Sequence, residues 1–477
     1  MPLPRVRVPA TEELRAGFAA IRARLEVPGA FPPEVEAAAQ AAAERAVAAD
    51  RVDRRDLPFV TIDPVGSRDL DQAMHLERRG DGHRVHYAIA DVAAFVDPGD
   101  PVDQEARRRV VTMYSPDDRS PLHPTVLSEA AASLLPDGDR PAVLWTIDLD
   151  GSGEVVDRRV ERALVRTAAQ LGYEEGQRLV EAGGHPALAE LSTVGERRMA
   201  VQAARGGISL HLPNQSVVER PAEEGGGYEL VYDAPLPIEQ WNEQISLMTG
   251  MVAADLMLEA GAGLLRTLPP PPDHVVRQLG RCARGLGVPW PKQTGDYAAI
   301  LAGLDPADPA HAALIAQAAR LFRGAGYVGF TDGPPEQPEQ AAIGAPYAHV
   351  TAPLRRLGDR FAIELALAAH DGRAPEGWAT EALEALPELL EDGARRQAAL
   401  DRACIDFVEA MVLRDRVGDR FPVLVTEVEG REARVQFRDP AVLARTEGDG
   451  LVAGEEVEVE LTAVRPEEGR LELTPVR

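Results

Sequence analysis

The chain has 477 residues, of which 45% are hydrophobic and 27% are charged, as expected of an ordinary folded protein with about three domains. Its 51 Lys+Arg and 77 Asp+Glu residues give a formal net charge of −26, which excludes a passive nucleic-acid coat because such proteins are basic overall. Two cysteines, Cys282 and Cys404, are too few for a disulfide framework or a cysteine-based zinc site. A local basic channel inside an acidic exterior remains compatible with this charge.

The first 56 residues are predicted to form a small helical module. Residues 11–25 offer an N-cap Thr, early acidic residues and apolar residues at helical spacing. Residues 32–51 begin with proline and are rich in alanine, which is typical of a second helix. The module is a winged helix or helix-turn-helix in one interpretation and a helical support without a ligand in the other.

Neither a signal peptide nor a membrane span is predicted. The amino terminus lacks the apolar core of a signal peptide. The most apolar stretch, residues 245–265, is interrupted by Asp255 and Glu259. We therefore expect a cytoplasmic protein.

After residue 57 the hydrophobic pattern changes from helical to alternating. Strands are predicted at residues 59–63, in a hairpin closed by Gly-Asp-Gly at 80–82, and in a second pair around residues 150–153. Helices are predicted at 174–183, 190–205 and 238–261, followed by Pro-rich breaks and a long helical stretch that ends near Arg420.

The last segment returns to short alternating strands, at residues 421–430, 431–437, 455–464 and 470–476. Four or five strands in this length predict a small barrel of the OB type. The fold class is therefore α+β, with predicted domains at residues 1–56, 57–419 and 420–477.

An acidic loop, residues 61–72 ("TIDPVGSRDLDQ"), contains Asp63, Asp69 and Asp71. A solvated acidic loop is the simple interpretation, because the chain is rich in acidic residues. A metal site is the alternative, since flanking strands would hold the loop and carboxylate oxygens suit Mg²⁺ or Mn²⁺. An EF-hand does not fit, and a D-x-D motif at residues 69–71 would ignore Asp63.

Phosphoryl transfer is the chemistry that needs such a group of carboxylates. Two divalent ions about 3.5–4 Å apart can activate a water and stabilise the leaving oxygen. A basic residue should also face the charge that develops on phosphorus.

Three ordered segments resemble the ribonuclease II/ribonuclease R family of 3′→5′ exoribonucleases. They are "FVTIDPVGSRDLDQAM" (59–74), the stretch from "HYAIADVAAFV" to "LLPDGDR" (86–140) and "YAHVTAPLRRLGDRF" (347–361). The resemblance runs from about residue 57 to residue 420. It implies an RNB-type catalytic domain with a buried RNA channel, and an S1 RNA-binding domain as the carboxy-terminal barrel.

The resemblance implies a divalent-metal site on the acidic loop. Asp63, Asp69 and Asp71 occupy three of the family's four aspartate positions, and Asp71 matches the one tied most closely to cleavage. Gln72 stands at the fourth position, where its carbonyl oxygen is expected to serve as a neutral metal ligand. Arg355, in "TAPLRR", matches the arginine beside the scissile phosphate. The expected ion is Mg²⁺, with Mn²⁺ as an alternative.

The resemblance also implies RNA-binding residues. Tyr114 matches a tyrosine that stacks on the 3′-terminal nucleotide, and Glu243 matches a helix glutamate that contacts it. Arg356 and Tyr347 belong to the third resembling segment and are assigned to RNA binding. Without the resemblance, Tyr114 would be a core aromatic, the arginine pair a solvated helix start and Glu243 an exposed acid.

Further arginines are expected to line a channel for the RNA backbone: Arg107, Arg108, Arg109 and Arg360. Leu210 is expected where relatives carry an aromatic base clamp. We expect the helical module to stand in place of the family's amino-terminal cold-shock barrels.

The expected function is processive, hydrolytic degradation of single-stranded RNA from its 3′ end to nucleoside 5′-monophosphates, by a monomer. A catalytically impaired RNA-binding protein, with Gln72 at a metal-ligand position, is the main alternative. A nucleotide-sugar transferase is a distant third, because it explains neither "TAPLRR" nor the terminal barrel.

Overall fold

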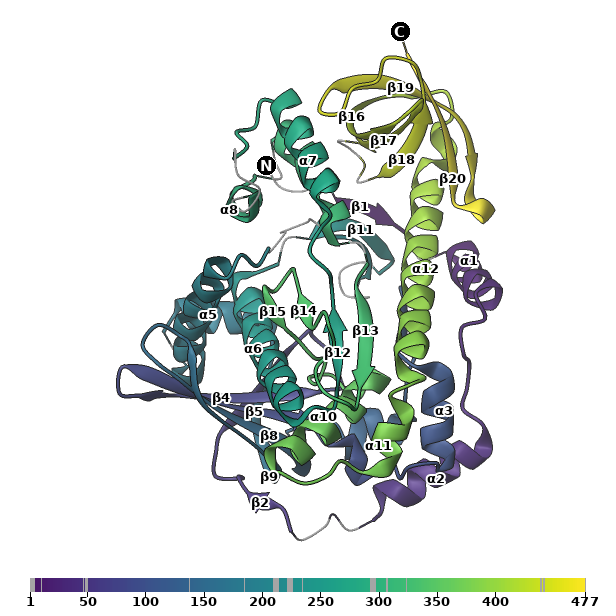
Figure 1. The fold of residues 1–477 in the computed structure, drawn as a ribbon. Helices are drawn as coiled ribbons and strands as arrows, with labels where there is room; N and C mark the ends of the chain where they lie inside the picture. Colours follow the sequence, from purple (N-terminus) through teal and green to yellow (C-terminus); the bar gives the residue numbers. More distant parts are fainter. Residues whose placement is uncertain are drawn as a thin grey trace.

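The computed structural model describes residues 5–476 except 10, 46, 48–49, 137, 184, 209–213, 221–225, 234, 292–296, 306–307, 323, 438–439 and 441. The chain forms a lower body around a large sheet and an upper part that contains the terminal barrel, with the long helix α12 running between them (Figure 1). The α-helices are α1 (Glu12–Arg24), α2 (Pro33–Ala43), α3 (Pro101–Arg109), α4 (Tyr173–Glu181), α5 (Pro186–Ala204), α6 (Pro237–Ala260), α7 (Asp273–Gly285), α8 (Tyr297–Ala302), α9 (Pro309–Ala318), α10 (Leu357–His370), α11 (Gly377–Ala382) and α12 (Leu386–Leu413).

The strands belong to separate sheets and hairpins. They are β1 (Arg5–Val8), β2 (Val52–Asp53), β3 (Phe59–Asp63), β4 (Gln72–Arg79), β5 (Gly82–Ala90), β6 (Met113–Ser115), β7 (Asp118–Ser120), β8 (Asp139–Leu149), β9 (Val155–Gly172), β10 (Asn214–Glu219), β11 (Tyr228–Asp233), β12 (Gly263–Thr267), β13 (Gly326–Phe330), β14 (Glu339–Gln340), β15 (Ala345–Pro346), β16 (Arg420–Glu429), β17 (Glu432–Phe437), β18 (Leu443–Glu447), β19 (Glu456–Arg465) and β20 (Arg470–Pro475).

The large sheet has the strand order β2-β9-β3-β4-β5-β8, and β9 pairs with β8 as well. The long strand β9 is antiparallel to β8 along its first part and parallel to β3 along its last, so the pairings form a closed ring. A two-residue turn at Gly80 and Asp81 joins β4 to β5, and Gly80 has a positive φ of 65°. The strands predicted from alternation in this region are confirmed.

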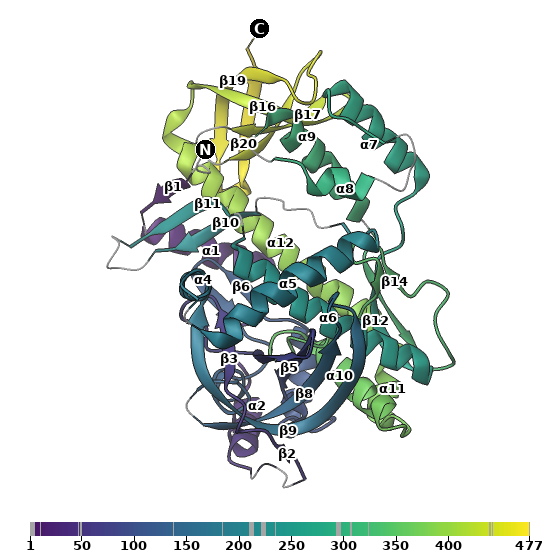
Figure 2. The ribbon, with the colours of Figure 1, turned by 90° about the vertical axis from the view of Figure 1, so that its left-hand side faces the viewer.

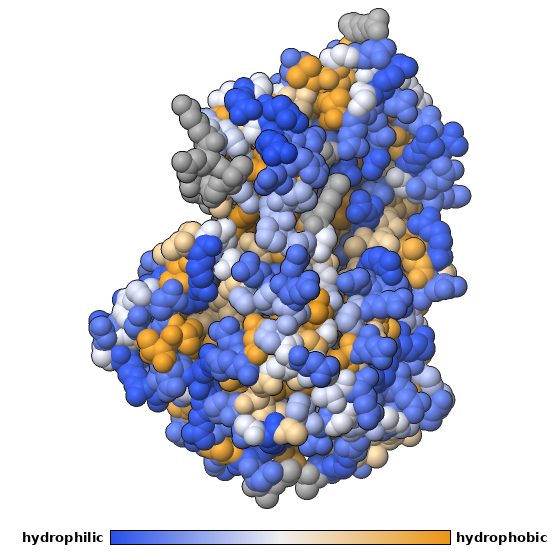
Figure 3. Space-filling view, in the orientation of Figure 1, coloured by the Kyte–Doolittle hydropathy of each residue, from blue (hydrophilic) through white to orange (hydrophobic). Residues whose placement is uncertain are grey.

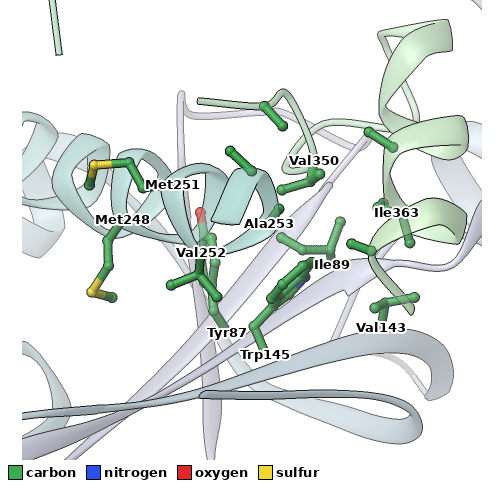
Figure 4. Close-up of a cluster of buried hydrophobic side chains, with 14 of the residues drawn as sticks. Tyr87, Ile89, Val143, Trp145, Met248, Met251, Val252, Ala253, Val350 and Ile363 are labelled. Atoms are coloured by element: carbon green, nitrogen blue, oxygen red, sulfur yellow. The ribbon is translucent and has the colours of Figure 1, made fainter. Parts of the chain in front are cut away.

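Helices α6 and α10 pack in the main core with the large sheet. Every residue of α10 from Leu357 to Ala368 is buried, and the charged residues among them, Asp359, Arg360 and Glu364, form ion pairs inside the fold. Helix α6 crosses one face of the sheet, with Val252 and Ala253 lying over Tyr87, Ile89 and Trp145 (Figure 4). The acidic loop is thereby attached to a rigid sheet-and-helix core.

The two predicted amino-terminal helices are both present, but they pack in different cores. Phe18 of α1 packs edge-on against Tyr228 and Phe407, so α1 joins α12 and the barrel. Val35 and Ala39 of α2 pack with Leu70 of the acidic loop instead. Strand β1 was not predicted from the sequence. It is the edge strand of a three-stranded sheet with the order β1-β11-β10. The domain boundary at residue 56 stays a prediction.

The terminal barrel contains β18-β17-β16-β19-β20 in that order, and β18 and β20 approach each other to bring it near closure. The predicted small barrel is confirmed, and β18 is the one of its five strands for which no range was predicted. Helix α7 lies beside the barrel in both ribbon views (Figures 1 and 2). Helix α9 packs against β16, where Gln317 donates to the carbonyl of Thr426 at 3.4 Å.

Hydrophilic residues cover most of the face shown in Figure 3, with scattered small apolar patches. Among the described residues, no helix combines the length and apolar character that a membrane crossing needs.

A buried carboxyl group of Glu409, on α12, joins the helix to two neighbours. It accepts hydrogen bonds from the backbone N–H of Leu443 at 2.7 Å and from the amide of Gln215 at 2.6 Å. Burial raises the pKa of Glu409 to about 8. The folded chain therefore holds this proton at a pH where the unfolded chain has released it, so the stabilisation is lost as pH rises from about 4 to about 8.

We expect the melting temperature to fall between pH 5 and pH 8.5, and Glu409→Gln to remove about 2–4 °C of that fall. The glutamine remains neutral at both pH values and keeps an oxygen for Leu443. Thermal unfolding of the wild type and the variant at the two pH values tests this. Identical pH dependence in both proteins would contradict the assignment.

Candidate active site

The acidic loop is fixed to the core at Leu70. This side chain is fully buried, its N–H donates to Ser133 Oγ at 2.9 Å, and its carbonyl accepts from the N–H of Leu134 at 2.9 Å. Asp63 ends β3, and Gln72 begins β4. The carboxylates therefore lie on a backbone that is held from both sides rather than on a free loop.

Asp71 is buried at 4% exposure beside Arg355. Its Oδ1 accepts from the N–H of Leu354 at 2.7 Å, and its Oδ2 lies 3.4 Å from Arg355 Nε. Burial raises the pKa of Asp71 to about 8, although the Arg355 guanidinium opposes the rise. The negative charge on Asp71 is thus only partly compensated by its protein neighbours.

Asp63 shares the same guanidinium. Burial raises the pKa of Asp63 to about 6, the charge of Arg355 lowers it, and the charge of Asp69 raises it further. The charge of Arg355 therefore lowers the pKa of both Asp63 and Asp71.

Asp69 is bonded to the residues that follow α3. Its Oδ2 accepts from the Tyr114 hydroxyl at 3.2 Å, and its Oδ1 lies 3.3 Å from Arg119 Nη1. The Tyr114 side chain is 40% exposed, and its backbone N–H donates to Gln397 at 3.0 Å. Tyr114 is consequently an accessible ring at the acidic loop rather than a core aromatic.

Gln72 has two partners of its own. Its Nε2 donates to the carbonyl of Thr351 at 2.7 Å, and its Oε1 accepts from the Tyr87 hydroxyl at 2.6 Å. A metal ion would have to share that oxygen with Tyr87.

A cavity of about 630 Å³ opens beside these residues, between the first half of α6 and the segment that leads into α10. Six of the predicted site residues line it: Asp63, Gln72, Glu243, Tyr347, Arg355 and Arg356. Asp71 lies against Arg355, which lines the cavity, and Asp69 accepts a hydrogen bond from the Tyr114 hydroxyl. The structure thus brings residues from four distant parts of the chain to one place.

The two RNA-binding residues predicted near Arg355 are held firmly. Arg356 pairs with buried Asp359, with Nη2 to Oδ2 at 2.7 Å. Tyr347 is buried, and its ring lies edge-on to His349 with centroids 5.4 Å apart. A side chain at Gly250 of α6 would overlap the Tyr347 ring, so the glycine lets helix and ring approach closely.

Sequence reasoning missed several residues of the cavity wall, among them Tyr173, Asn242 and Arg266. Tyr173 begins α4 directly after β9, and a strand-to-helix boundary is the pattern that could have identified it. Asn242 Oδ1 is buried and has no hydrogen-bond partner among the described residues.

Two of the arginines expected along an RNA channel are buried elsewhere, and that prediction is wrong for them. Arg109 is fully buried, donates to Glu105 at 2.7 Å and lies over the Phe31 ring. Arg360 is 3% exposed and donates to Asp103 at 2.7 Å. Both pairs stabilise the fold around α3. Leu210, the expected base-clamp position, lies outside the described residues.

The acidic loop fits a divalent ion in donor chemistry. Among the described residues, no three His, Cys, Asp or Glu side chains form a ready-made metal cluster. Half-buried Asp63 and buried Asp71 nevertheless supply carboxylates with elevated pKa values, so the charge of Arg355 compensates their desolvation only in part and a cation would stabilise both. Asp69 would first have to exchange its contacts with Tyr114 and Arg119.

Curated relatives cover most of the chain. The chain is 27% identical to "Ribonuclease R" of Escherichia coli strain K12 over 473 aligned residues, covering 90% of this chain and 54% of that protein. The chain therefore spans about half the length of that relative.

Solved structures share the fold. The structure "Mycoplasma genitalium RNase R in complex with ribose methylated single-stranded RNA" matches with a TM-score of 0.86 at 19% identity, covering 98% of this chain and 78% of the other. "Structure of yeast Ssd1, a pseudonuclease" matches with a TM-score of 0.65 at 16% identity, covering 89% and 53%. The same fold thus occurs in a nuclease and in a pseudonuclease.

Two family models match the chain. The "RNB domain" matches residues 51–367, and the "RNase II-type exonuclease C-terminal S1 domain" matches residues 419–476. The first match alone covers more than half of the chain and contains every candidate site residue. This chain belongs to the RNB-domain family of ribonuclease II-type exonucleases.

Proposed function

We propose that the chain is a processive, hydrolytic exoribonuclease that degrades single-stranded RNA from its 3′ end to nucleoside 5′-monophosphates. The observation that carries the proposal is the buried Asp71 carboxylate, with Oδ2 at 3.4 Å from Arg355 Nε, beside a cavity of about 630 Å³. The likeness to E. coli Ribonuclease R supports it.

The chemistry follows from this placement. A water attacks the last phosphorus, and the bond from that phosphorus to the 3′ oxygen of the preceding nucleotide breaks. The 3′ oxygen takes a proton, and the terminal nucleotide leaves with a 5′-phosphate. Arg355, 46% exposed at the cavity, can reach the phosphoryl oxygens, where its guanidinium would stabilise the charge that develops.

RNB-family nucleases generally depend on divalent metal ions. We propose that Asp63, Asp69 and Asp71 hold Mg²⁺ or Mn²⁺ in this chain. The bound ion would act as a Lewis acid that activates the water, and its positive charge would balance the negative charge of the carboxylates. The elevated pKa values of Asp63 and Asp71, which Arg355 lowers only in part, support this assignment, because a cation would lower both further.

Residues around the cavity would hold the terminal nucleotide. Tyr114 offers an exposed ring for base stacking, worth about 1–3 kcal/mol. Glu243, Asn242 and Tyr347 line the cavity, and an acceptor among them would recognise the ribose 2′-hydroxyl. Arg356, which is held by its ion pair with Asp359, would add positive charge at the cavity wall. A cytoplasmic monomer is the proposed state of the protein.

A catalytically impaired RNA-binding protein is the second candidate, because Gln72 replaces a charged ligand and the fold also occurs in a pseudonuclease. Asp63, Asp69, Asp71 and Arg355 together favour the enzyme, since a decayed site would have no reason to keep all four.

End-labelled RNA distinguishes these candidates. The protein is incubated with 5′-labelled and 3′-labelled single-stranded RNA, with and without Mg²⁺. We expect immediate release of labelled mononucleotide from the 3′ label only, and only with Mg²⁺. Tight binding without any product would favour the silent RNA-binding protein.

Tyr114→Ala is expected to lengthen the final undegraded oligonucleotide by one or more nucleotides, because the last base loses its stacking platform. High-resolution gels of end products compare it with Tyr114→Phe, which keeps the ring and loses the hydroxyl contact to Asp69. The phenylalanine variant should retain the wild-type end product. Equal end products from all three proteins would refute the stacking role.

A further inference from the structure

A chain of hydrogen bonds connects α6 to the segment that carries Arg355; we name Ser246, Tyr87, Gln72 and Thr351 the Gln72 network. Ser246 Oγ lies 2.7 Å from the Tyr87 hydroxyl. The hydroxyl donates to Gln72 Oε1 at 2.6 Å, and Gln72 Nε2 donates to the Thr351 carbonyl at 2.7 Å. The strand register explains the contact between Tyr87 and Gln72, because Gln72 pairs with Ile89 and is therefore a diagonal neighbour of Tyr87 on the same face.

The directions of these bonds fix the orientation of the Gln72 amide. The Thr351 carbonyl only accepts, so the group facing it must be the amide nitrogen. The Gln72 oxygen then faces Tyr87, which donates to it and is left to accept from Ser246. Tyr87 is fully buried, and Figure 4 shows its hydroxyl directed toward α6.

Two consecutive residues, Asp71 and Gln72, bond the backbone of residues 351–354, one as an acceptor and the other as a donor. Asp71 Oδ1 accepts from the N–H of Leu354, while Gln72 donates to the carbonyl of Thr351. Between these two points the N–H of Ala352 donates to Asp359 at 2.8 Å. The backbone on the amino-terminal side of Arg355 is thereby fastened to the strand that follows the acidic loop.

We propose that Gln72 is a positioning residue that holds Arg355 against Asp71, and that it is not a metal ligand. This inference rests on the proposed function and assigns a role to the one position where the acidic motif departs from its family. A carboxylate at residue 72 would place negative charge against the Thr351 carbonyl and lose the donated bond. The neutral amide donates to the Thr351 carbonyl and accepts from the Tyr87 hydroxyl, which in turn bonds Ser246.

Two variants test the proposal: Gln72→Glu, which keeps an oxygen for Tyr87 but loses the donor, and Tyr87→Phe, which loses the hydroxyl and keeps the ring. We expect each to lower kcat about five- to tenfold, with KM and the half-saturating Mg²⁺ concentration within about twofold. Hydrogen exchange in residues 350–356 should become about tenfold faster in both. The control Tyr228→Phe removes another buried hydroxyl, on β11, and should change none of these quantities.

The proposal would be overturned if Gln72→Glu lowered the half-saturating Mg²⁺ concentration while Tyr87→Phe kept the wild-type kcat. Residue 72 would then be a metal-ligand position. Wild-type exchange rates in both variants would also overturn it. Should the wild type fail to degrade RNA, the proposed function fails, while exchange rates and Mn²⁺ affinity measured by calorimetry still decide this inference. Faster exchange with unchanged Mn²⁺ affinity would support it.

Discussion

Asp71→Asn is expected to lower RNA hydrolysis by at least about 10³-fold and to leave RNA affinity within about threefold. Asparagine keeps the oxygen that accepts from Leu354, so the loop should retain its geometry. It removes the negative charge that faces Arg355 and the proposed cation. Gel degradation assays beside binding titrations at equal Mg²⁺ measure both quantities.

Glu409→Gln is the matched control. Glu409 is likewise buried with a pKa raised to about 8, but it lies on α12 against the barrel. Its neutralisation should leave hydrolysis within about twofold. Rapid hydrolysis by Asp71→Asn would remove Asp71 from the mechanism, and equal losses in both variants would indicate a general effect of losing a buried carboxyl group.

Arg355→Ala is expected to lower kcat about 10²- to 10³-fold, because no other guanidinium lies against Asp71 Oδ2 among the described residues. Arg355 lowers the pKa values of Asp63 and Asp71. Its removal raises both, so these carboxylates ionise only at higher pH. The remaining activity of the variant should therefore increase with pH over a range that is shifted upward from that of the wild type.

Rate measurements from pH 6 to pH 9 test this prediction with two companions. Arg355→Lys keeps the charge and loses the planar fork, so it should recover part of the rate and most of the pH profile. Arg373→Ala, beyond the opposite end of α10 and paired with Asp371, should behave as the wild type. An unshifted profile in Arg355→Ala would contradict the electrostatic role.

The large sheet, the hairpin at Gly80 and the terminal barrel could be predicted because alternation and turn residues determine them locally. Strand β1 could not, because it pairs with β11, which lies more than 200 residues away in the chain. Strands β10 and β11, which pair with each other, were also not predicted. The amino-terminal helices were predicted as elements, but their partners depend on tertiary packing. Phe18 of α1 meets Phe407, a contact with no local pattern.

The candidate site was predicted largely through a resemblance, and the structure adds what the resemblance lacks. The resemblance identifies the residues of the acidic loop, but it does not reveal that Asp71 and Gln72 bond Leu354 and Thr351. Arginine content suggested a channel at Arg109 and Arg360, whereas buried Glu105 and Asp103 hold both inside the fold. Charge partners across the fold, rather than residue type, decided their role.

Anomalous scattering from Mn²⁺ in crystals that hold single-stranded RNA with a non-hydrolysable last linkage tests the central claim most directly. We expect a manganese peak within ligand distance of Asp63 and Asp71, next to the last phosphate, with the Arg355 guanidinium facing that phosphate. Manganese bound elsewhere, or a terminal phosphate distant from Asp71 and Arg355, would contradict it.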